Sequence, residues 1–280
     1  QTATGRMYTW RVKFDKSDTQ WLAEFEEQNT ATPEKITEAK VGYVFSSTPC
    51  MISEQELKKN HGSERKLNLL TESLEMLQDD VTDNLATVLI SGTAALKQPI
   101  GLETWVQEVP GTTTPTSVAE IDRSDRTWWR NQATDLSGTL GLGMPSLESL
   151  KLACAHGSEK VDMILTSKTA YAWMYANAVG LQREEHKDAA KLGFVSFTWD
   201  GMPVTYSDEI DSAKSGGDSI YLLRLKDWEL NFMADEGRMH RTEWFKPEKT
   251  RAICCYMYND LTLLCKKPYN QGVLFDVTGA

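Results

Sequence analysis

The sequence lacks any run of about 18 consecutive apolar residues, the length that a membrane-spanning helix needs. It also lacks the charged start, apolar stretch and small-residue cleavage site of a secretory signal peptide. These absences exclude a helical membrane span and give no sign of secretion. The 280-residue chain is 40% hydrophobic and 25% charged, which is typical of a folded chain with a sizeable core.

Positive charge is scarce. There are 30 Lys and Arg residues against 40 Asp and Glu, so the formal net charge is −10. Affinity for nucleic acid depends on Lys and Arg side chains that neutralise phosphates, and an acidic chain repels the phosphate backbone. We therefore expect no tight binding of DNA or RNA by this chain.

Cysteine and histidine are also few. The five cysteines contain no CxxC pair, and we interpret them as buried, reduced thiols. The four histidines are scattered without an HxxxH pair, so no metal site is indicated. No catalytic constellation emerges elsewhere. We expect neither an enzyme nor a bound cofactor.

The first 52 residues predict a β-arm. Residues 7–14 are rich in aromatic and β-branched side chains and predict a strand, and residues 36–52 predict one or two returning strands. The polar insert between them contains Trp21, Leu22 and Phe25. A two-stranded ribbon is marginal in water and too thin to bury such side chains itself. The tip is therefore expected to need a partner outside the arm.

The strongest periodic signal lies in residues 64–90. Apolar residues recur there every three or four positions, at Leu67, Leu70, Leu74, Leu77, Val81, Leu85 and Val88. This spacing predicts one helix, roughly 40 Å long at 1.5 Å per residue, with a single apolar face. Ser53 and Glu56 have the capping-box spacing of a shorter helix just before it.

Residues 91–127 are rich in Gly, Thr and Pro and predict a long connector with little regular structure. The connector leads into the stretch IDRSDRTWWRNQA, in which Trp128 and Trp129 stand side by side before Arg130. Two large rings in a polar segment either anchor it to a core or contact another molecule. The residues of this stretch leave both interpretations open.

Short helices and strands follow. Helices are expected from Pro145 or Ser146 onward and over residues 168–180, with strands at 161–167 and at SIYLLRL, WELNFM and VLFDV. Asp200-Gly201 predicts a hairpin turn. RAICCYMY and LTLLCKK are interpreted as two strands separated by a turn at Asn259-Asp260. The whole chain is therefore predicted to be α+β.

The order of these features resembles the major capsid proteins of tailed bacteriophages, which share the Hong Kong 97 capsid fold. The residues that carry the resemblance are the Ile-Asp-Arg-Ser and Trp-Trp-Arg stretch after the connector, ILTSKTAY at 164–171 and DGMPV at 200–204. It covers about residues 7–277. It implies a Hong Kong 97-like α+β fold with an extended β-arm (the E-loop), a long spine helix, and peripheral and axial domains.

The resemblance also implies a division of the chain. Residues 1–5 would be the remnant of an N-terminal arm, the rest of which is cleaved in maturation, disordered or trimmed. Residues 6–52 would be the E-loop, and 53–127 the spine helix and connector of the peripheral domain. Residues 128–245 would be the axial domain and 246–280 the closing strands of the peripheral domain. The E-loop lies over a neighbouring subunit in such shells, which would give Trp21, Leu22 and Phe25 their partner. Trp128, Trp129 and Arg130 would anchor the connector where the two domains join.

The implied function is that of a head shell protein. Copies of the chain would form hexamers and pentamers of an icosahedral shell around double-stranded DNA, held without tight or sequence-specific binding. Portal and scaffold proteins are further implied partners, as is a decoration or cement protein, but no membrane is. The implied location is the virion capsid, assembled in the host cytoplasm.

Two alternatives stay open. The shell protein of a cellular nanocompartment has the same fold and would enclose a cargo enzyme in place of DNA. A Trp-rich carbohydrate-binding or hydrolase domain is the other, because nine tryptophans could line a groove. That domain would be a monomer or a small oligomer.

Overall fold

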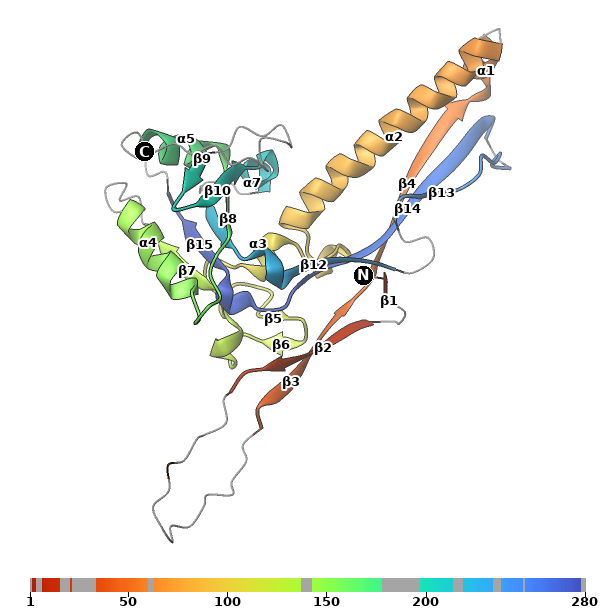
Figure 1. Ribbon diagram of the computed structural model, residues 1–280. Coiled ribbons are helices and arrows are strands. Elements are labelled where there is room, and N and C mark those ends of the chain that lie inside the picture. Colours follow the sequence, from red (N-terminus) through yellow and green to blue (C-terminus); the bar gives the residue numbers. More distant parts are fainter. Residues whose placement is uncertain are drawn as a thin grey trace.

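A computed structural model describes residues 2–3, 7–15, 21, 34–59, 63–136, 143–177, 197–213, 219–233, 238–248 and 250–277. Figure 1 shows a compact body from which two thin parts project away from each other. One, the lobe, contains the long helix α2 (Ser63–Ser91) beside strands β4 (Val44–Ser53) and β14 (Ala252–Cys265). The other is the antiparallel ribbon of β2 (Met7–Lys13) and β3 (Ile36–Gly42).

A six-stranded sheet forms the body. Its spatial order is β7 (Gln132–Asp135), β15 (Gly272–Phe275), β11 (Ile220–Leu223), β8 (Met163–Thr166), β10 (Met202–Tyr206) and β9 (Phe197–Trp199). Side chains alternate between two cores, so that Ile220 and Leu222 face one and Tyr221 and Leu223 the other. The predicted hairpin is confirmed, because Asp200 and Gly201 have φ values of 50° and 76° between β9 and β10.

The two faces of this sheet are covered differently. Helices α4 (Gly143–Cys154) and α5 (Lys168–Asn177) pack on one face. The connector packs on the other, with only short elements: η1 (Ala94–Leu96), α3 (Leu102–Trp105), β5 (Ser117–Val118), β6 (Ile121–Asp122) and η2 (Thr127–Trp129). This confirms a connector with little regular structure, and it shows that the connector is part of the core.

The second sheet has five strands. The order is β1 (Thr2–Ala3), β12 (Trp228–Met233), β14 and β13 (His240–Arg241), and β4 also pairs with β14. Helix α2 lies on this sheet through Leu77 and Val81, which confirms the predicted helix and its apolar face. The other helices of the described residues are α1 (Glu54–Lys59), α7 (Asp208–Ala213), η5 (Leu225–Asp227) and η6 (Pro268–Asn270). Within the described ranges, no helix is long and apolar enough to span a membrane.

The predicted turn at Asn259-Asp260 is wrong, because β14 runs through both residues without a break. Asn259 lies opposite Ser46 and Asp260 opposite Phe45 in the β4–β14 ladder. Asn259 is buried, and its Oδ1 accepts a hydrogen bond from the Met239 backbone N–H at 2.8 Å. A complete ladder with β4 and this side-chain contact outweigh the local turn preference of the dipeptide.

The sheets also cross the expected division of the chain in three places. β4, expected in the arm, pairs along its full length with β14. β12 and β13, expected in the axial domain, belong to the same sheet as β14, whereas the closing strand β15 lies between β7 and β11 in the body. Pairing between strands far apart in sequence depends on tertiary packing, which a division into consecutive segments does not capture.

Candidate functional site at the junction of the two sheets

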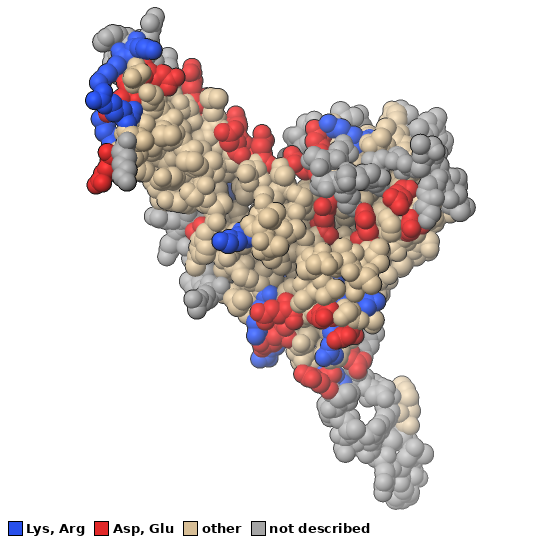
Figure 2. Space-filling model, turned by 180° about the vertical axis from the view of Figure 1, so that it is seen from behind, with Lys and Arg blue, Asp and Glu red and all other residues tan. Residues whose placement is uncertain are grey.

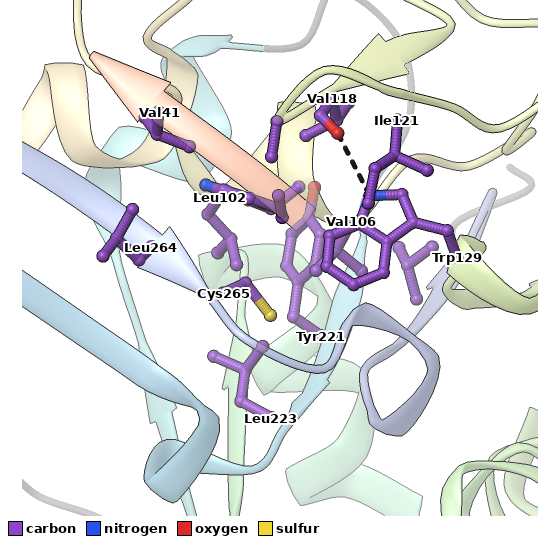
Figure 3. Close-up of a cluster of buried hydrophobic side chains, with 14 of the residues drawn as sticks. Val41, Leu102, Val106, Val118, Ile121, Trp129, Tyr221, Leu223, Leu264 and Cys265 are labelled. Carbon is purple, nitrogen blue, oxygen red and sulfur yellow. Dashed lines mark hydrogen bonds between the residues drawn. The ribbon is translucent and has the colours of Figure 1, made fainter. Parts of the chain in front are cut away.

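Trp129 lies in the larger core, where the connector meets both sheets (Figure 3). Its side chain is fully buried, and its indole Nε1 donates a hydrogen bond to the Val118 carbonyl at 3.1 Å. Tyr221 contributes to this core from the six-stranded sheet and Leu264 from the five-stranded sheet. The Trp105 ring lies 6.4 Å away, edge to face. The core around this buried indole therefore joins the connector to both sheets.

Arg123 is a second buried residue of the connector. Its Nη1 donates to the Thr104 carbonyl at 3.2 Å and its Nη2 to the Trp105 carbonyl at 2.7 Å. These carbonyls end α3, where a cation offsets the unpaired acceptors of a helix terminus. Burial lowers the pKa of Arg123 to about 10, so the guanidinium stays charged at neutral pH. Arg123 therefore ties the segment after β6 to the end of α3.

Arg130 closes the same loop from the other side. Its Nε donates to the Arg123 carbonyl at 2.5 Å and its Nη2 to the Ser124 carbonyl at 2.8 Å. The guanidinium lies against Gly111, where a Cβ would come within 2.7 Å of it. Gly111 also has a φ of 96°, so this close approach needs glycine.

Trp128 packs against the outside of the core that holds its neighbour. The two indole planes differ by 66°, and Trp128 is half-buried, stacked on Phe14 at 4.8 Å with an interplanar angle of 14°. Beside this stack is an open groove of about 790 Å³, whose lining also includes Lys13, His156 and Tyr269. One ring of the pair is thus buried inside the core, and the other packs on its outside and lines the groove.

The chain crosses from the six-stranded to the five-stranded sheet after β11 and returns after β14. An ionic network holds these two crossing segments together. Glu159 accepts hydrogen bonds from Lys267 Nζ and, at 2.8 Å, from Asn270 Nδ2, and its Oε2 lies 3.2 Å from Arg224 Nη1. Arg224 also contacts the buried Asp227 at 3.0 Å. Burial alone would raise the pKa of Glu159, but the hydrogen bonds from Lys267 and Asn270 outweigh it and lower this pKa to about 2.

The predicted site residues separate into two places. Trp128, Trp129 and Arg130 are together at the junction of the sheets, and their role as an anchor stays a prediction. Trp21 lies on the arm with 93% of its surface exposed. Leu22 and Phe25, predicted to contact a neighbour with it, lie outside the described residues.

Sequence reasoning missed three polar or aromatic residues of the junction. Asn131 exchanges hydrogen bonds with the Gln107 backbone, at 3.0 Å from its N–H and 2.7 Å to its carbonyl. Trp105 and Arg123 are the others, both fully buried. Trp105-Val106 was the available signal, because an adjacent apolar pair in a polar connector indicates burial. Arg123 offered none, since it stands in a row of alternating charges.

The tryptophans do not form a binding groove of their own. Eight of the nine pack in or against the three hydrophobic clusters, and the ninth is Trp21. In the part of the chain that the structure describes, no three His, Cys, Asp or Glu side chains are grouped to hold a metal ion. All five cysteines are free thiols, and burial raises the pKa of Cys154 to about 12. This packing does not favour the carbohydrate-binding or hydrolase alternative.

Comparison with known proteins finds similarity in structure but not in sequence. No protein-family model matches the chain, and no curated protein matches it in sequence. Among solved structures, the capsid of a native GTA particle is similar with a TM-score of 0.67 and 11% identity, over 100% of this chain and 87% of that one. The capsid of cyanophage A-1(L) gives a TM-score of 0.62 and 13% identity, over 99% and 90% of the two chains.

An encapsulin complex from Synechococcus elongatus is similar to the same degree, with a TM-score of 0.62 and 12% identity over 99% of this chain and 84% of that one. At sequence identities of 11–13%, the structural similarity shows the fold alone. The chain has the α+β fold of Hong Kong 97-type capsid proteins over nearly its full length.

Proposed function

We propose that this chain is the major capsid protein of a tailed bacteriophage. Copies of it would assemble into hexamers and pentamers of an icosahedral shell that encloses double-stranded DNA. The observation that carries the proposal is the capsid fold over 99–100% of the chain, shared with a cyanophage capsid and a GTA capsid. The shell would make this a structural protein without a catalytic role.

The parts of the molecule fit such a shell. The six-stranded sheet with α4 and α5 would be the axial domain, and the five-stranded sheet with α2 the peripheral domain. The β2–β3 ribbon would be the base of the E-loop that reaches over a neighbouring subunit. The ionic network around Glu159 would keep the two domains in a fixed relation, because it lies where the chain crosses between them.

Exposed apolar side chains support self-assembly. Trp21, Phe45, Met51 and Met76 are each at least 65% exposed; Trp21 lies on the arm between β2 and β3, and the other three lie on the lobe. Such side chains on thin projections are a liability in a monomer and become buried when neighbours cover them. Each added subunit would meet several neighbours at once, so modest contacts would close a stable shell.

The charge of the lobe fits a container that does not grip its DNA. Helix α2 has no Lys or Arg from residue 67 to its end, while Glu72, Glu75, Asp79 and Asp83 are exposed. Figure 2 shows acidic side chains along one edge of the lobe and few charges on the surface next to it. Portal, scaffold and decoration proteins would be the other partners. The shell would assemble in the host cytoplasm and become the virion capsid.

A nanocompartment shell is the second candidate, favoured by the encapsulin that matches as well as the cyanophage capsid does. Sedimentation velocity and negative-stain imaging of the expressed chain test both proposals. Closed shells or capsomer rings are expected. Packaged DNA would support the phage head, and a protein cargo the nanocompartment. A chain that remains monomeric, even with a scaffold protein present, would contradict both.

A further inference from the structure

We propose that Cys50 and Cys255 are a redox-sensitive pair that closes into a disulfide when a shell of this chain passes from reducing to oxidising surroundings. The bond crosslinks β4 to β14 beneath α2. Its occasion rests on the proposed function, because a shell assembled in a host cytoplasm begins reduced and meets oxidants after release. Its chemistry depends only on how the two strands place the thiols.

The strand register brings the two thiols together. Cys50 on β4 lies directly opposite Cys255 on β14, and the two thiols hydrogen-bond each other. Both face α2, which runs beside the two strands (Figure 1), in the core of the lobe. The Cys50 thiol also donates a hydrogen bond to the Ser73 carbonyl of α2 at 3.8 Å. The pairing of β4 with β14 therefore makes neighbours of two cysteines far apart in sequence.

The spacing of the strands allows a disulfide, but a strained one. The Glu54 N–H donates to the Arg251 carbonyl, and hydrogen-bonded pairs alternate along the ladder, so Cys50 and Cys255 are also a hydrogen-bonded pair. The Cα atoms of such a pair are about 5.5 Å apart, within the roughly 4.4–6.8 Å that disulfides span. Their Cβ atoms are also about 5.5 Å apart, whereas a disulfide needs about 3.5–4.5 Å. Closure therefore draws the strands together locally, and the strain makes the bond easy to reduce again.

The other three cysteines are held apart from this pair. Cys254 directly precedes Cys255, but successive side chains of a strand point to opposite faces, so Cys254 lies on the face that carries Met51. Cys154 and Cys265 are buried in the two cores of the body. Cys254 is therefore a natural control, because it differs from Cys255 mainly in the face on which it lies.

The two thiols differ in access, which sets the order of the reaction. Cys50 is half-buried and Cys255 is fully buried, so an oxidant reaches Cys50 first. With glutathione disulfide, the Cys50 thiolate attacks one sulfur, forms a mixed disulfide and releases one glutathione thiolate. The Cys255 thiolate then attacks the Cys50 sulfur and releases the second glutathione thiolate. The two protein thiols thus lose two electrons and two protons, and the glutathione disulfide gains them as two thiols.

The lobe is where a crosslink has most to add. Its core contains four buried residues among those that the structure describes, and β4 reaches that core through its ladder with β14. Local opening of a structure is easiest where few apolar side chains are buried. A bond between β4 and β14 limits how far the strands can separate when the lobe opens.

Peptide mapping tests the pair. The assembled chain is incubated with glutathione disulfide at about pH 8, because burial raises the pKa of Cys255 to about 11 and thiolates are scarce at neutral pH. Free thiols are then alkylated, and the digested chain is analysed by mass spectrometry. The unsubstituted chain and Cys254→Ala should give peptides linked through Cys50 and Cys255, in a band at the 31.5 kDa mass of one chain on a non-reducing gel. Cys50→Ala and Cys255→Ala should give less than a tenth of the linked product.

Three results would overturn the proposal and leave the capsid function standing. They are an unsubstituted chain without the linked peptides, an equal yield of linked product from Cys255→Ala, and a link formed between chains. A chain that forms the link but never assembles in reducing buffer would contradict the capsid function, and with it the occasion proposed for the bond.

Hydrogen exchange measures the consequence of the bond. Oxidation should slow the exchange of β4 amides at least about tenfold, because the crosslink restrains the lobe, and dithiothreitol should restore the original rate. The amides of β8 and β11, in the body, should not change. Cys50→Ala, treated in the same way, is the control and should show no change in β4. A linked chain whose β4 amides exchange as fast as before would overturn the restraining role of the bond.

Discussion

The core around Trp129 and the core of the lobe differ in how many parts of the chain build them. Among the residues that the structure describes, the first contains 16 buried residues from the ribbon, the connector, α7 and both sheets, whereas the second contains four, all from α2 and β14. Burial of apolar surface is the main favourable term in folding, so the body should hold most of the stability of the single chain.

The lobe has a second face that its own chain does not cover. Opposite the face that packs on α2, Phe245, Tyr256 and Tyr258 form a row of stacked rings at 5.5 and 6.1 Å, and Phe45 and Met51 are more than 60% exposed. A layer that is apolar on both sides but covered on one side is typical of a surface that meets a partner. The body therefore specifies the fold, and the lobe presents surface to neighbours.

The largest effect is expected from Trp129→Ala. Removing this ring should lower the free energy of unfolding by about 3–5 kcal/mol, because it leaves a cavity among side chains of both sheets. Denaturant unfolding followed by circular dichroism measures the change. Trp128→Ala is the control and should cost less than half as much, since that ring is half-buried. Equal losses would show that the two rings do not divide between core and surface.

Leu77→Ala should act on the lobe alone. Leu77 is 4% exposed between α2 and β14, so its loss should cost about 2–3 kcal/mol locally. Hydrogen exchange should speed up in α2 and the first half of β14 and remain unchanged in β8 and β11. Met76→Ala, at a position that is 67% exposed, should change neither. Faster exchange in β8 or β11 would mean that the two cores unfold as one unit.

Glu159 couples the two parts in a pH-dependent way. Its pKa is about 2 in the folded chain and near 4.5 without its partners, so the folded state binds the proton more weakly. The resulting stability, about 2 kcal/mol after allowance for partial exposure, is present above pH 4.5 and is lost as the pH falls toward 2.

Glu159→Gln should therefore be less stable at pH 7 and show a flatter stability profile between pH 4.5 and 2, measured by denaturant unfolding. Glu148→Gln is a suitable control, because Glu148 pairs with Lys151 on the surface of α4. Parallel profiles for the original chain and Glu159→Gln would assign the acid sensitivity to other carboxylates.

Pro49→Ala should have the smallest effect on folding. The Glu54 N–H donates a hydrogen bond to the Arg251 carbonyl. Along an antiparallel strand the N–H groups point alternately toward the partner strand and away from it. Pro49, five residues before Glu54 and opposite Tyr256, therefore turns its nitrogen away from β14. Proline there removes a donor from the outer edge of β4 and discourages added strands. The variant should unfold within 0.5 kcal/mol of the original chain yet aggregate faster, as light scattering would detect. Unchanged aggregation would show that this edge is protected in another way.

The local elements could be predicted because their signals are local. Seven apolar residues at helical spacing were enough to locate α2, and Asp200-Gly201 to locate the β9–β10 turn. The Asn259-Asp260 turn failed for the opposite reason, since a long-range ladder and the contact to Met239 overrode the dipeptide. Arg123 could not have been identified as a core residue, because only the end of α3 supplies the carbonyls that pair with it.

The sequence by itself determined the arm, the spine helix, the irregular connector and the order of features that resembles a capsid protein. Periodicity and turn chemistry act between residues close in the chain, so they can be read without a structure. The tertiary structure alone decided which sheet each closing strand joins and which ring of the tryptophan pair is buried. Both depend on the packing of one core, whose members Trp129, Tyr221 and Leu264 are far apart in sequence and are related by no local pattern.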